Sequence, residues 1–526
     1  MILRKTAASI ALMWLIVLIS MVVGGVVPVR ASTLQTRAPI VIVGDGNFTA
    51  TNGVIGGNGT ASNPYLIEGW DIAELTVSNT NAYVVIRNVY IHSGVVTSFE
   101  RVVDFLAVSN VEVENVTVSD SVGADGVFLV VLSVRRSSDV AISQSNIISD
   151  MHSEGVVVSG SVDVSISGNI ISNANPGVLI IEGSDHITVS GNIISGNGSG
   201  VEMIRNGAGK VIVSDNRVES NLVGILGNRS GGNLTVVRNE VRSNGYTGIG
   251  MVSLGTISTI LDNDVDNNGW QLFRDYGSYG VGISAPDHAV IIGNTLSNNP
   301  IGLEAGDNPS GAGCIITMIG CIGTMDKVYH NNFLNNLVQA TLPHPCDCPC
   351  FCPTFSLDNG YPSAGNFWSD YHGVDNCSGL NQNVCLAPDG IGDTPVVIAP
   401  TTIDHYPLMK PFAPTVSGTI RFQPASIASQ SAGGYLKALV RLPIGFNRSN
   451  LIPSSIRLND KLAALAVAPL NQPSGAAVLV VTFNLTQVRS LLSNPGNYVL
   501  NVTGNLLTST NFRPFQAAAT VRVFAI

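Results

Sequence analysis

The sequence is poor in charged and aromatic residues. Of its 526 residues, 12% are charged and 6% are aromatic, and only four are Trp. The formal net charge of −10 and the pI near 5.2 argue against nucleic-acid binding, which requires basic patches. Hydrophobic residues still make up 45% of the chain, which is enough apolar surface for a long core. We therefore expect a protein of more than one domain that does not bind nucleic acid.

Long apolar runs are also scarce. Only the start of the sequence contains one that is long enough to span a membrane. Arg4 and Lys5 precede an apolar run over about 7–29, and a plausible cleavage site follows at Ala31. This pattern predicts a signal peptide over residues 1–31, with an uncleaved N-terminal anchor as the alternative. Either reading places the protein outside the cytoplasm, secreted or at the cell surface. Ten Asn-X-Ser/Thr sequons permit glycosylation without indicating that it occurs.

A repeat of 23 or 24 residues fills the middle of the chain. The phrase SISGNIIS at 165–172 returns as TVSGNIIS at 188–195, and a period of this length is typical of a solenoid. Alternating apolar residues such as Ile187 and Val189 specify strands rather than helices. The fold class predicted is therefore all-β, a right-handed parallel β-helix. We expect the central Asn of each unit to stack in a hydrogen-bonded ladder at a turn, formed by Asn169, Asn192, Asn216, Asn239, Asn263 and Asn294.

Differences in composition divide the chain after residue 31 into two caps, the coils between them and a C-terminal domain. The Gly- and Asn-rich residues 32–82 are expected to form an N-terminal β cap, since an open coil end is a reactive strand edge. Coils are expected over 83–340, and a Cys-rich C-terminal cap over 341–410. After a Pro-rich break, evenly spaced strands with polar turns over 414–526 predict a small immunoglobulin-like β-sandwich.

Two segments carry a family resemblance. The opening IVIVGDGNFTATNGVIGGNGTASNPYLIEGWDI (40–72) and the closing NFWSDYHGVDN…APDGIGDTPVVI…IDHYPLMKP (366–411) flank the GNIIS-type coils. Together they resemble the NosD-type β-helix proteins, also called periplasmic copper-binding or CASH (carbohydrate-binding and sugar-hydrolase) domains, and are most similar to archaeal surface versions. The resemblance covers roughly 38–411. It implies the β-helix fold, and it implies copper binding only by analogy with members that help to mature a copper site.

The eight Cys allow three interpretations, which are a metal site, disulfides and redox activity. Spacing by two residues from Cys346 to Cys352 would direct four sulfurs to one face of a strand, as a copper site requires, with His344 as a further ligand. An even number of Cys in an oxidising compartment instead favours disulfides, whose pairing the sequence does not fix. The disulfide candidates are Cys314, Cys321, Cys346, Cys348, Cys350, Cys352, Cys377 and Cys385.

A second metal candidate is the turn Asp389-Gly-Ile-Gly-Asp393. Its two carboxylates on a Gly-rich turn suit Ca²⁺ or another hard cation, with Asp370 and Asp375 as further ligands. The alternative is that these carboxylates only stabilise the turn.

The step of 31 residues between Asn263 and Asn294 contains an insertion, which we interpret as a surface loop. Aromatic rings stack on sugars, and Arg and Asp bind hydroxyl groups, so this loop is a candidate carbohydrate site. A second polar cluster is Asp150, His152 and Glu154. The candidate carbohydrate-binding residues are Trp270, Phe273, Arg274, Asp275, Tyr276 and Tyr279.

The sequence favours a non-enzymatic secreted or surface protein whose partners are polysaccharides or cell-envelope components. The first alternative is an enzyme acting on polysaccharide, a lyase, hydrolase or epimerase. Such an enzyme needs carboxylates at a fixed separation, and no pair of this kind can be identified from the sequence. The second alternative, implied by the resemblance alone, is a copper-binding accessory protein.

Overall fold

The computed structural model describes residues 34–524, with internal gaps. The gaps are residues 93, 97–99, 120, 124–128, 182, 205–208, 229–232, 253–257, 277–279, 286–288, 306–325, 342–354, 401, 414–415, 429–432, 443–449, 460, 471–477, 493 and 508–511. The predicted signal peptide or anchor lies outside the described residues. Within the described part, no helix has the length and apolar character needed to cross a membrane.

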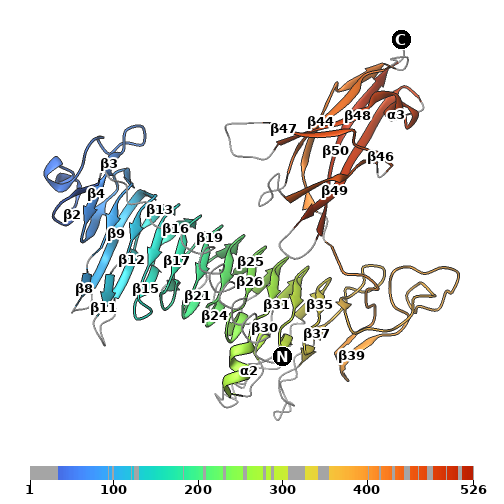
Figure 1. Cartoon of the computed structure of the whole chain (residues 1–526), viewed down its shortest axis with the longest axis horizontal. Coiled ribbons are helices and arrows are strands. Elements are labelled where there is room, and N and C mark those ends of the chain that lie inside the picture. The colour runs from blue at the N-terminus through green and yellow to red at the C-terminus, as the bar shows by residue number, and fades with distance from the viewer. Residues whose placement is uncertain are drawn as a thin grey trace, which may run out of the picture.

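The first and larger part is a right-handed parallel β-helix, so the predicted fold class is confirmed (Figure 1). Each coil contributes one short strand to each of three parallel sheets, A, B and C, in that order along the chain. Sheet A contains β1 (Gln35–Thr36), β4 (Trp70–Ile72), β7 (Tyr90–Ile91), β10 (Thr117–Val118), β14 (Asn146–Ile148), β17 (Ile170–Ser172), β20 (Ile193–Ser195), β23 (Arg217–Glu219), β26 (Glu240–Arg242), β29 (Asp264–Asp266), β32 (Thr295–Ser297), β35 (Asn332–Leu334) and β38 (Phe367–Trp368).

The other two sheets share the long strand β9 (Glu100–Glu114), which passes from sheet B into sheet C. Sheet B contains β2 (Ile40–Val43), β5 (Leu75–Thr80), β9, β12 (Leu129–Arg135), β15 (Glu154–Ser159), β18 (Val178–Ile181), β21 (Ser199–Ile204), β24 (Val223–Asn228), β27 (Thr247–Val252), β30 (Val281–Ala285), β33 (Ile301–Ala305) and β36 (Val338–Thr341). Sheet C contains β3 (Tyr65–Glu68), β6 (Val84–Arg87), β9, β13 (Ser138–Ser143), β16 (Val162–Ser167), β19 (Ile187–Ser190), β22 (Val211–Ser214), β25 (Leu234–Val237), β28 (Ser258–Leu261), β31 (Ala289–Ile292), β34 (Asp326–Tyr329) and β37 (Phe355–Ser356).

Register between coils builds the core. Ile171, Ile194, Val218 and Val241 are in register in sheet A, and each is fully buried. Side chains alternate along a strand, so the residues on either side of each core position face outward. The parallel pairings begin with β1, β2 and β3, so residues before 83 already belong to stacked coils. The loop between β2 and β3 carries η1 (Asp45–Asn47) and η2 (Ala50–Asn52), and β8 (Gly94–Val96) pairs with β11 (Ser121–Gly123) outside the three sheets.

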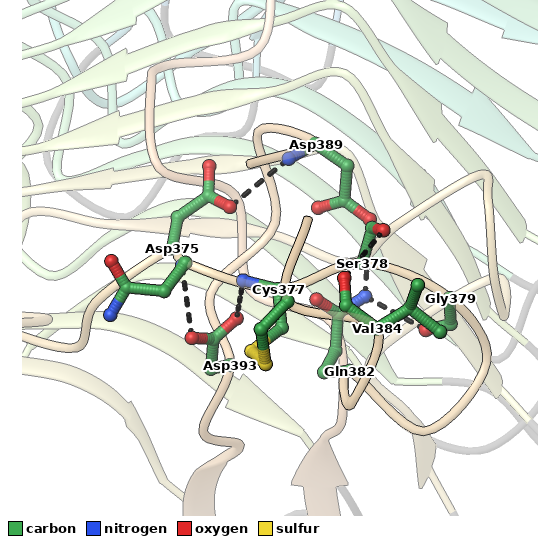
Figure 2. The surroundings of a disulfide bond; sticks show 10 residues. Asp375, Cys377, Ser378, Gly379, Gln382, Val384, Asp389 and Asp393 are labelled. Carbon is green, nitrogen blue, oxygen red and sulfur yellow. Dashed lines mark hydrogen bonds between the residues drawn. A yellow bond between two sulfur atoms is a disulfide. The ribbon is translucent and has the colours of Figure 1, made fainter. Parts of the chain in front are cut away.

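The C-terminal end of the β-helix is closed by an irregular cap. Trp368 stacks on Phe333 with ring centroids 4.3 Å apart and covers the end of the core. Beyond it lies the antiparallel pair β39 (Val396–Ala399) and β40 (Thr402–Asp404). A disulfide joins Cys377 to Cys385 in this cap (Figure 2).

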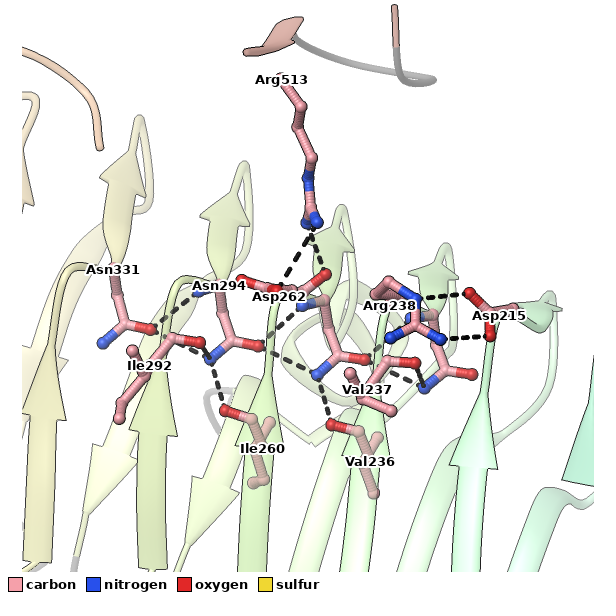
Figure 3. Close-up of polar contacts among 12 residues, drawn as sticks. Asp215, Val236, Val237, Arg238, Ile260, Asp262, Ile292, Asn294, Asn331 and Arg513 are labelled. Atoms are coloured by element: carbon pink, nitrogen blue, oxygen red, sulfur yellow. Dashed lines mark hydrogen bonds and ion pairs between the residues drawn. The ribbon is translucent and has the colours of Figure 1, made fainter. Parts of the chain in front are cut away.

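The stacked Asn side chains form a continuous hydrogen-bonded column where sheet C turns into sheet A (Figure 3). In each rung the Asn Oδ1 accepts hydrogen bonds from both the backbone N–H and the Nδ2 of the Asn one coil earlier, as Asn239 does from Asn216 at 3.0 Å. The preceding residue often adopts a positive φ, such as 58° at Asp215. The column contains the six predicted residues Asn169, Asn192, Asn216, Asn239, Asn263 and Asn294, and continues through Asn331 and Asn366.

A second column of Asn lies where sheet A turns into sheet B. Each of its members follows a first-column Asn by five residues, as Asn244 follows Asn239. Their side chains are also buried and make the same pattern of bonds to the next coil. The second column contains Asn197, Asn221, Asn244, Asn268, Asn299 and Asn336.

Asp404 of the cap terminates the first column. Its Oδ2 accepts hydrogen bonds from the backbone N–H of Asn366 and from the Trp368 indole, both at 2.8 Å. Its Oδ1 accepts from the backbone N–H of Tyr406. Asp404 is fully buried, and this burial raises the pKa of its carboxyl group to about 7 against the opposing effect of the three hydrogen bonds.

The C-terminal part is a β-sandwich with its own core, centred on side chains such as Leu436, Phe483 and Leu500. Helix α3 (Leu485–Ser490) begins at Asn484, whose side chain accepts hydrogen bonds from the first helical N–H groups. One sheet contains β41 (Val416–Ser417), β43 (Ser426–Ala428), β45 (Leu451–Leu458), β46 (Leu462–Ala463), β49 (Gly496–Leu507) and β50 (Phe512–Phe524), and the other contains β42 (Thr419–Gln423), β44 (Tyr435–Arg441), β47 (Ala466–Leu470) and β48 (Val478–Asn484).

One partly buried arginine links the sandwich to the β-helix. Arg513 of β50 donates a hydrogen bond from Nη2 to the backbone oxygen of Asp262 at 2.7 Å, and its Nη1 lies 3.7 Å from the Asp262 carboxylate. Asp262 immediately precedes a first-column Asn. Arg238 and Asp215 occupy the same position in the two preceding coils, and Arg238 binds Asp215 through two hydrogen bonds (Figure 3). Arg513 therefore extends a row of alternating charges along one edge of sheet A.

Candidate functional site

Three successive strands of sheet A carry charged residues on both sides of a buried Val. Their sequences are RVE in β23, EVR in β26 and DVD in β29. The central Val218, Val241 and Val265 are fully buried, so the flanking residues face outward. Register places equivalent positions directly beside one another across the three coils. We call this surface the charged face, and it consists of Arg217, Glu219, Glu240, Arg242, Asp264 and Asp266.

Ion pairs organise the charged face. Glu219 accepts from Arg217 and from Arg242, each at 2.9 Å. Arg242 also lies 2.7 Å from Glu240, so its guanidinium joins carboxylates of two neighbouring coils. Asp266 accepts hydrogen bonds at 2.7 Å from the side chains of Ser297 and Asn298. With two Arg and four carboxylates, the face has an excess of negative charge.

One carboxyl group on this face has an altered acidity. Burial raises the pKa of Glu240, Arg217 opposes the rise, and the carboxylates of Asp264, Glu219 and Asp266 add to it. A carboxyl group with a raised pKa beside other carboxylates can hold a proton at a pH where its neighbours are ionised. The arrangement can therefore both accept and donate hydrogen bonds to a hydroxyl-rich ligand.

The insertion that was expected to be an aromatic loop is instead a short helix, α2 (Trp270–Tyr276). The prediction of a loop was wrong. The turn that contains the second-column residue Asn268 is followed by Gly269, whose φ of 88° changes the direction of the chain just before the helix begins. The Trp270 indole donates a hydrogen bond to the Asn298 backbone oxygen at 2.7 Å. Since the Asn298 amide in turn binds Asp266, Trp270 is connected to the edge of the charged face.

The other predicted carbohydrate-binding residues follow Trp270 in the insertion. Arg274 and Asp275 are exposed on α2. The side chains of Phe273 and Tyr276, and all of Tyr279, lie outside the described residues. Of the predicted carbohydrate-binding residues, Trp270 is thus linked to the charged face through Asn298.

The carboxylates of the cap serve its turns (Figure 2). Asp393 accepts hydrogen bonds from the backbone N–H groups of Asn376 and Cys377, and Asp375 accepts from those of Asp389 and Gly390. Among the described residues, no group of three or more His, Cys, Asp or Glu side chains is placed to hold a metal ion. In the described part of the cap, Asp375 and Asp393 thus accept hydrogen bonds from turn N–H groups, and a Ca²⁺ site at Asp389 and Asp393 stays a prediction.

Two of the eight Cys lie within the described residues. The single pairing among described residues joins Cys377 and Cys385. The remaining candidates lie outside the described residues, namely Cys314, Cys321, His344, Cys346, Cys348, Cys350 and Cys352.

A family model matches the middle of the chain. Residues 138–373 match the family described as "Periplasmic copper-binding protein (NosD)". The β-helix is NosD-like. The match runs from β13 past β38, so the charged face lies within the NosD-like coils and the sandwich lies beyond them. The resemblance inferred from the opening and closing segments is thus confirmed.

Other comparisons add little to the NosD-like assignment. No curated protein matches the chain. Similar solved structures include the A-module of the Azotobacter vinelandii mannuronan C-5 epimerase AlgE6, at 15% identity, 54% coverage of this chain, 86% of that chain and a TM-score of 0.35. A double mutant of the periplasmic alginate epimerase AlgG is 13% identical to this chain, with a TM-score of 0.38. The match covers 53% of this chain and 74% of that chain. DFA-IIIase from Arthrobacter chlorophenolicus A6 is 11% identical to this chain, with a TM-score of 0.36. The match covers 57% of this chain and 78% of that chain. Such low scores say nothing about the activity of this chain.

Proposed function

We propose that this chain is an extracytoplasmic NosD-like β-helix protein that binds a neutral, hydroxyl-rich glycan along the charged face, without turnover. The observation that carries this proposal is the register of three charged strands, β23, β26 and β29, beside the indole of Trp270. Coils about 4.8 Å apart present their side chains as a regular row, which suits an extended chain of sugar rings.

The charges select the class of glycan. Four carboxylates against two Arg would repel an acidic polysaccharide, whereas carboxylates and guanidinium groups both bind neutral hydroxyls. The indole of Trp270 offers an aromatic surface on which one ring could stack. The neutral class is therefore favoured over the acidic one.

The location outside the cytoplasm rests on two observations. The apolar run over about 7–29 follows Arg4 and Lys5, as in a signal peptide or an N-terminal anchor. The matching family is described as periplasmic. The same description names copper; among the described residues no three or more His, Cys, Asp or Glu side chains are grouped to hold a metal ion, and the proposal assigns no step to copper or Ca²⁺.

Replacing Arg242 by Ala should weaken glycan binding about tenfold or more. This change removes ion pairs to Glu219 and Glu240 and leaves carboxylates of adjacent coils facing each other. Calorimetric titration with neutral oligosaccharides measures the effect. Arg441→Ala, an exposed residue of the sandwich, is the matched control and should bind as the wild type does. Equal affinity of all three proteins would contradict the assignment of the site.

A second function is favoured by one observation. The raised pKa of Glu240 beside Asp264 is the type of carboxyl pair that a polysaccharide lyase, hydrolase or epimerase uses for proton transfer. If the chain is such an enzyme, Glu240→Gln should abolish product formation while retaining binding. Formation of new reducing ends, unsaturated sugars or epimerised residues by the wild type would establish this alternative.

A further inference from the structure

A cavity of about 260 Å³ opens on the outer face of sheet B, away from the charged face. It lies over four neighbouring strands near the N-terminal half of the β-helix, β9, β12, β15 and β18. Its volume is below the range of about 300–1,000 Å³ that is usual for drug-sized ligands, so it suits a small molecule. It is lined by Arg101, Val130, Ser133, Arg135, Arg136, Glu154, Val157, Ser159 and Ile181.

The floor of the cavity is apolar. Val130, Val157 and Leu179 pack together on the outside of sheet B, separate from the main core, with Ile181 and Ile204 beside them. Outward-facing aliphatic residues that are almost fully buried are unusual on a lateral face. This floor would contact the apolar body of a ligand.

One polar atom at the floor is unsatisfied. Ser133 is fully buried, and its Oγ finds no hydrogen-bond partner in the described part of the chain. Register places Ser133 between Asp104 of β9 and Val157 of β15. Buried hydroxyl groups are nearly always paired, so an unpaired one that lines a cavity indicates a ligand that completes it.

The walls are positively charged. Arg101, Arg135 and Arg136 line the cavity together with one acidic residue, Glu154. Arg135 is held by two hydrogen bonds to Asp104, at 3.1 and 2.6 Å, which fixes its guanidinium at the wall. Against the carboxylates of Asp104 and Glu154, the three guanidinium groups leave an excess of positive charge in a chain of net charge −10, which favours a small anion.

From the floor, the unpaired hydroxyl and the walls together, we propose that this cavity binds a small organic carboxylate. The carboxylate faces Arg101 and Arg136, the apolar body lies on Val130 and Val157, and the Ser133 hydroxyl donates one hydrogen bond to the ligand. A short-chain fatty acid and the uronate end of a glycan share this chemistry. The site is independent of the glycan site on the charged face.

Binding to the full-length protein by titration calorimetry tests the proposal, with hexanoate and glucuronate as probes and hexan-1-ol and glucose as their neutral counterparts. At least one carboxylate should bind, and its neutral counterpart should bind at least tenfold more weakly. Which of the two carboxylates binds more tightly distinguishes a fatty acid from a uronate. No binding of either carboxylate up to about 10 mM, or equal binding of a neutral counterpart, would overturn the proposal.

Two variants connect binding to the cavity. Arg101→Met should weaken carboxylate binding at least tenfold, whereas Arg441→Ala on the sandwich should not. Ser133→Ala should weaken binding without lowering the melting temperature, because it removes a hydroxyl that the unliganded protein leaves unpaired. Wild-type affinity in both variants would place the ligand elsewhere and refute this site.

The pH dependence gives an independent test. Burial raises the pKa of Glu154, with Arg101 opposing the rise and Glu202 of β21 adding to it. The other charged groups that line the cavity with Glu154 are Arg135, which is paired with Asp104, and Arg136. As the pH rises through that pKa, Glu154 becomes negative and should repel the ligand, so affinity should fall. Glu154→Gln should remove this fall, and Glu304→Gln, farther along sheet B, should keep it; a wild-type affinity that does not change with pH would refute the role of Glu154.

Discussion

Asn239→Ala is expected to lower the free energy of unfolding by about 3–5 kcal/mol. Asn239 is buried in the first column, and its Oδ1 accepts both the backbone N–H and the Nδ2 of Asn216 at 3.0 Å. Its Nδ2 donates to Asn263 and to the backbone oxygen of Val213. The substitution leaves several of these groups buried without partners, and each costs about 1–3 kcal/mol. Urea unfolding followed by circular dichroism measures the loss.

Asn146→Ala provides the matched control. Asn146 lies on β14 of the same β-helix but faces outward, so its replacement should change stability by no more than about 0.5 kcal/mol. If Asn239→Ala proved as mild as this control, the column would be a consequence of the turns and not a source of their stability.

The second large effect concerns Asp404 and pH. Burial raises its pKa to about 7 from the usual 3.8, so the folded protein keeps a proton that the unfolded chain releases between these values. The folded state then binds more protons than the unfolded state, and stability should fall as the pH rises from about 4 to about 8. The fall attributable to this group is at most about 4 kcal/mol, at 1.36 kcal/mol per pH unit. Unfolding measured across this pH range gives the slope.

Two variants isolate that contribution. Asp404→Asn cannot ionise, so its stability should lack the part of the slope that belongs to this carboxyl group. Asp389→Asn, exposed on the same cap, should keep the wild-type slope. A wild-type slope in Asp404→Asn would mean that other groups cause the pH dependence.

The sequence predicted the parts of the fold that repeat. A period of 23 or 24 residues with a central Asn specifies stacked coils, because identical residues meet at every turn. The second column was present in the same repeat, five residues after the first, as in Asn216 and Asn221. It was missed because the repeated phrases TVSGNIIS (188–195) and VSDNRVES (213–220) end just before the second-column residues Asn197 and Asn221.

The candidate site was harder to predict because its residues do not repeat. Along β23, β26 and β29 the outward residues change from Arg and Glu to Asp, and they become a single surface only once the coils are in register. The cavity on sheet B is lined by residues from Arg101 to Ile181, which belong to coils of unequal length. No fixed spacing between residues in the sequence therefore predicts it. Helix α2 is short, and its aromatic content suggested a loop rather than a helix.

The most direct test of the proposed function measures binding and turnover in one experiment. The wild-type protein is incubated with a panel of neutral polysaccharides, and the bound fraction and any soluble products are determined together. We expect retention on at least one neutral glycan with no new reducing ends or unsaturated sugars, and a loss of about three- to tenfold in affinity in Trp270→Ala, as the removal of one stacked ring predicts. Products in the wild-type incubation, or no retention on any neutral glycan, would contradict binding without turnover at the charged face.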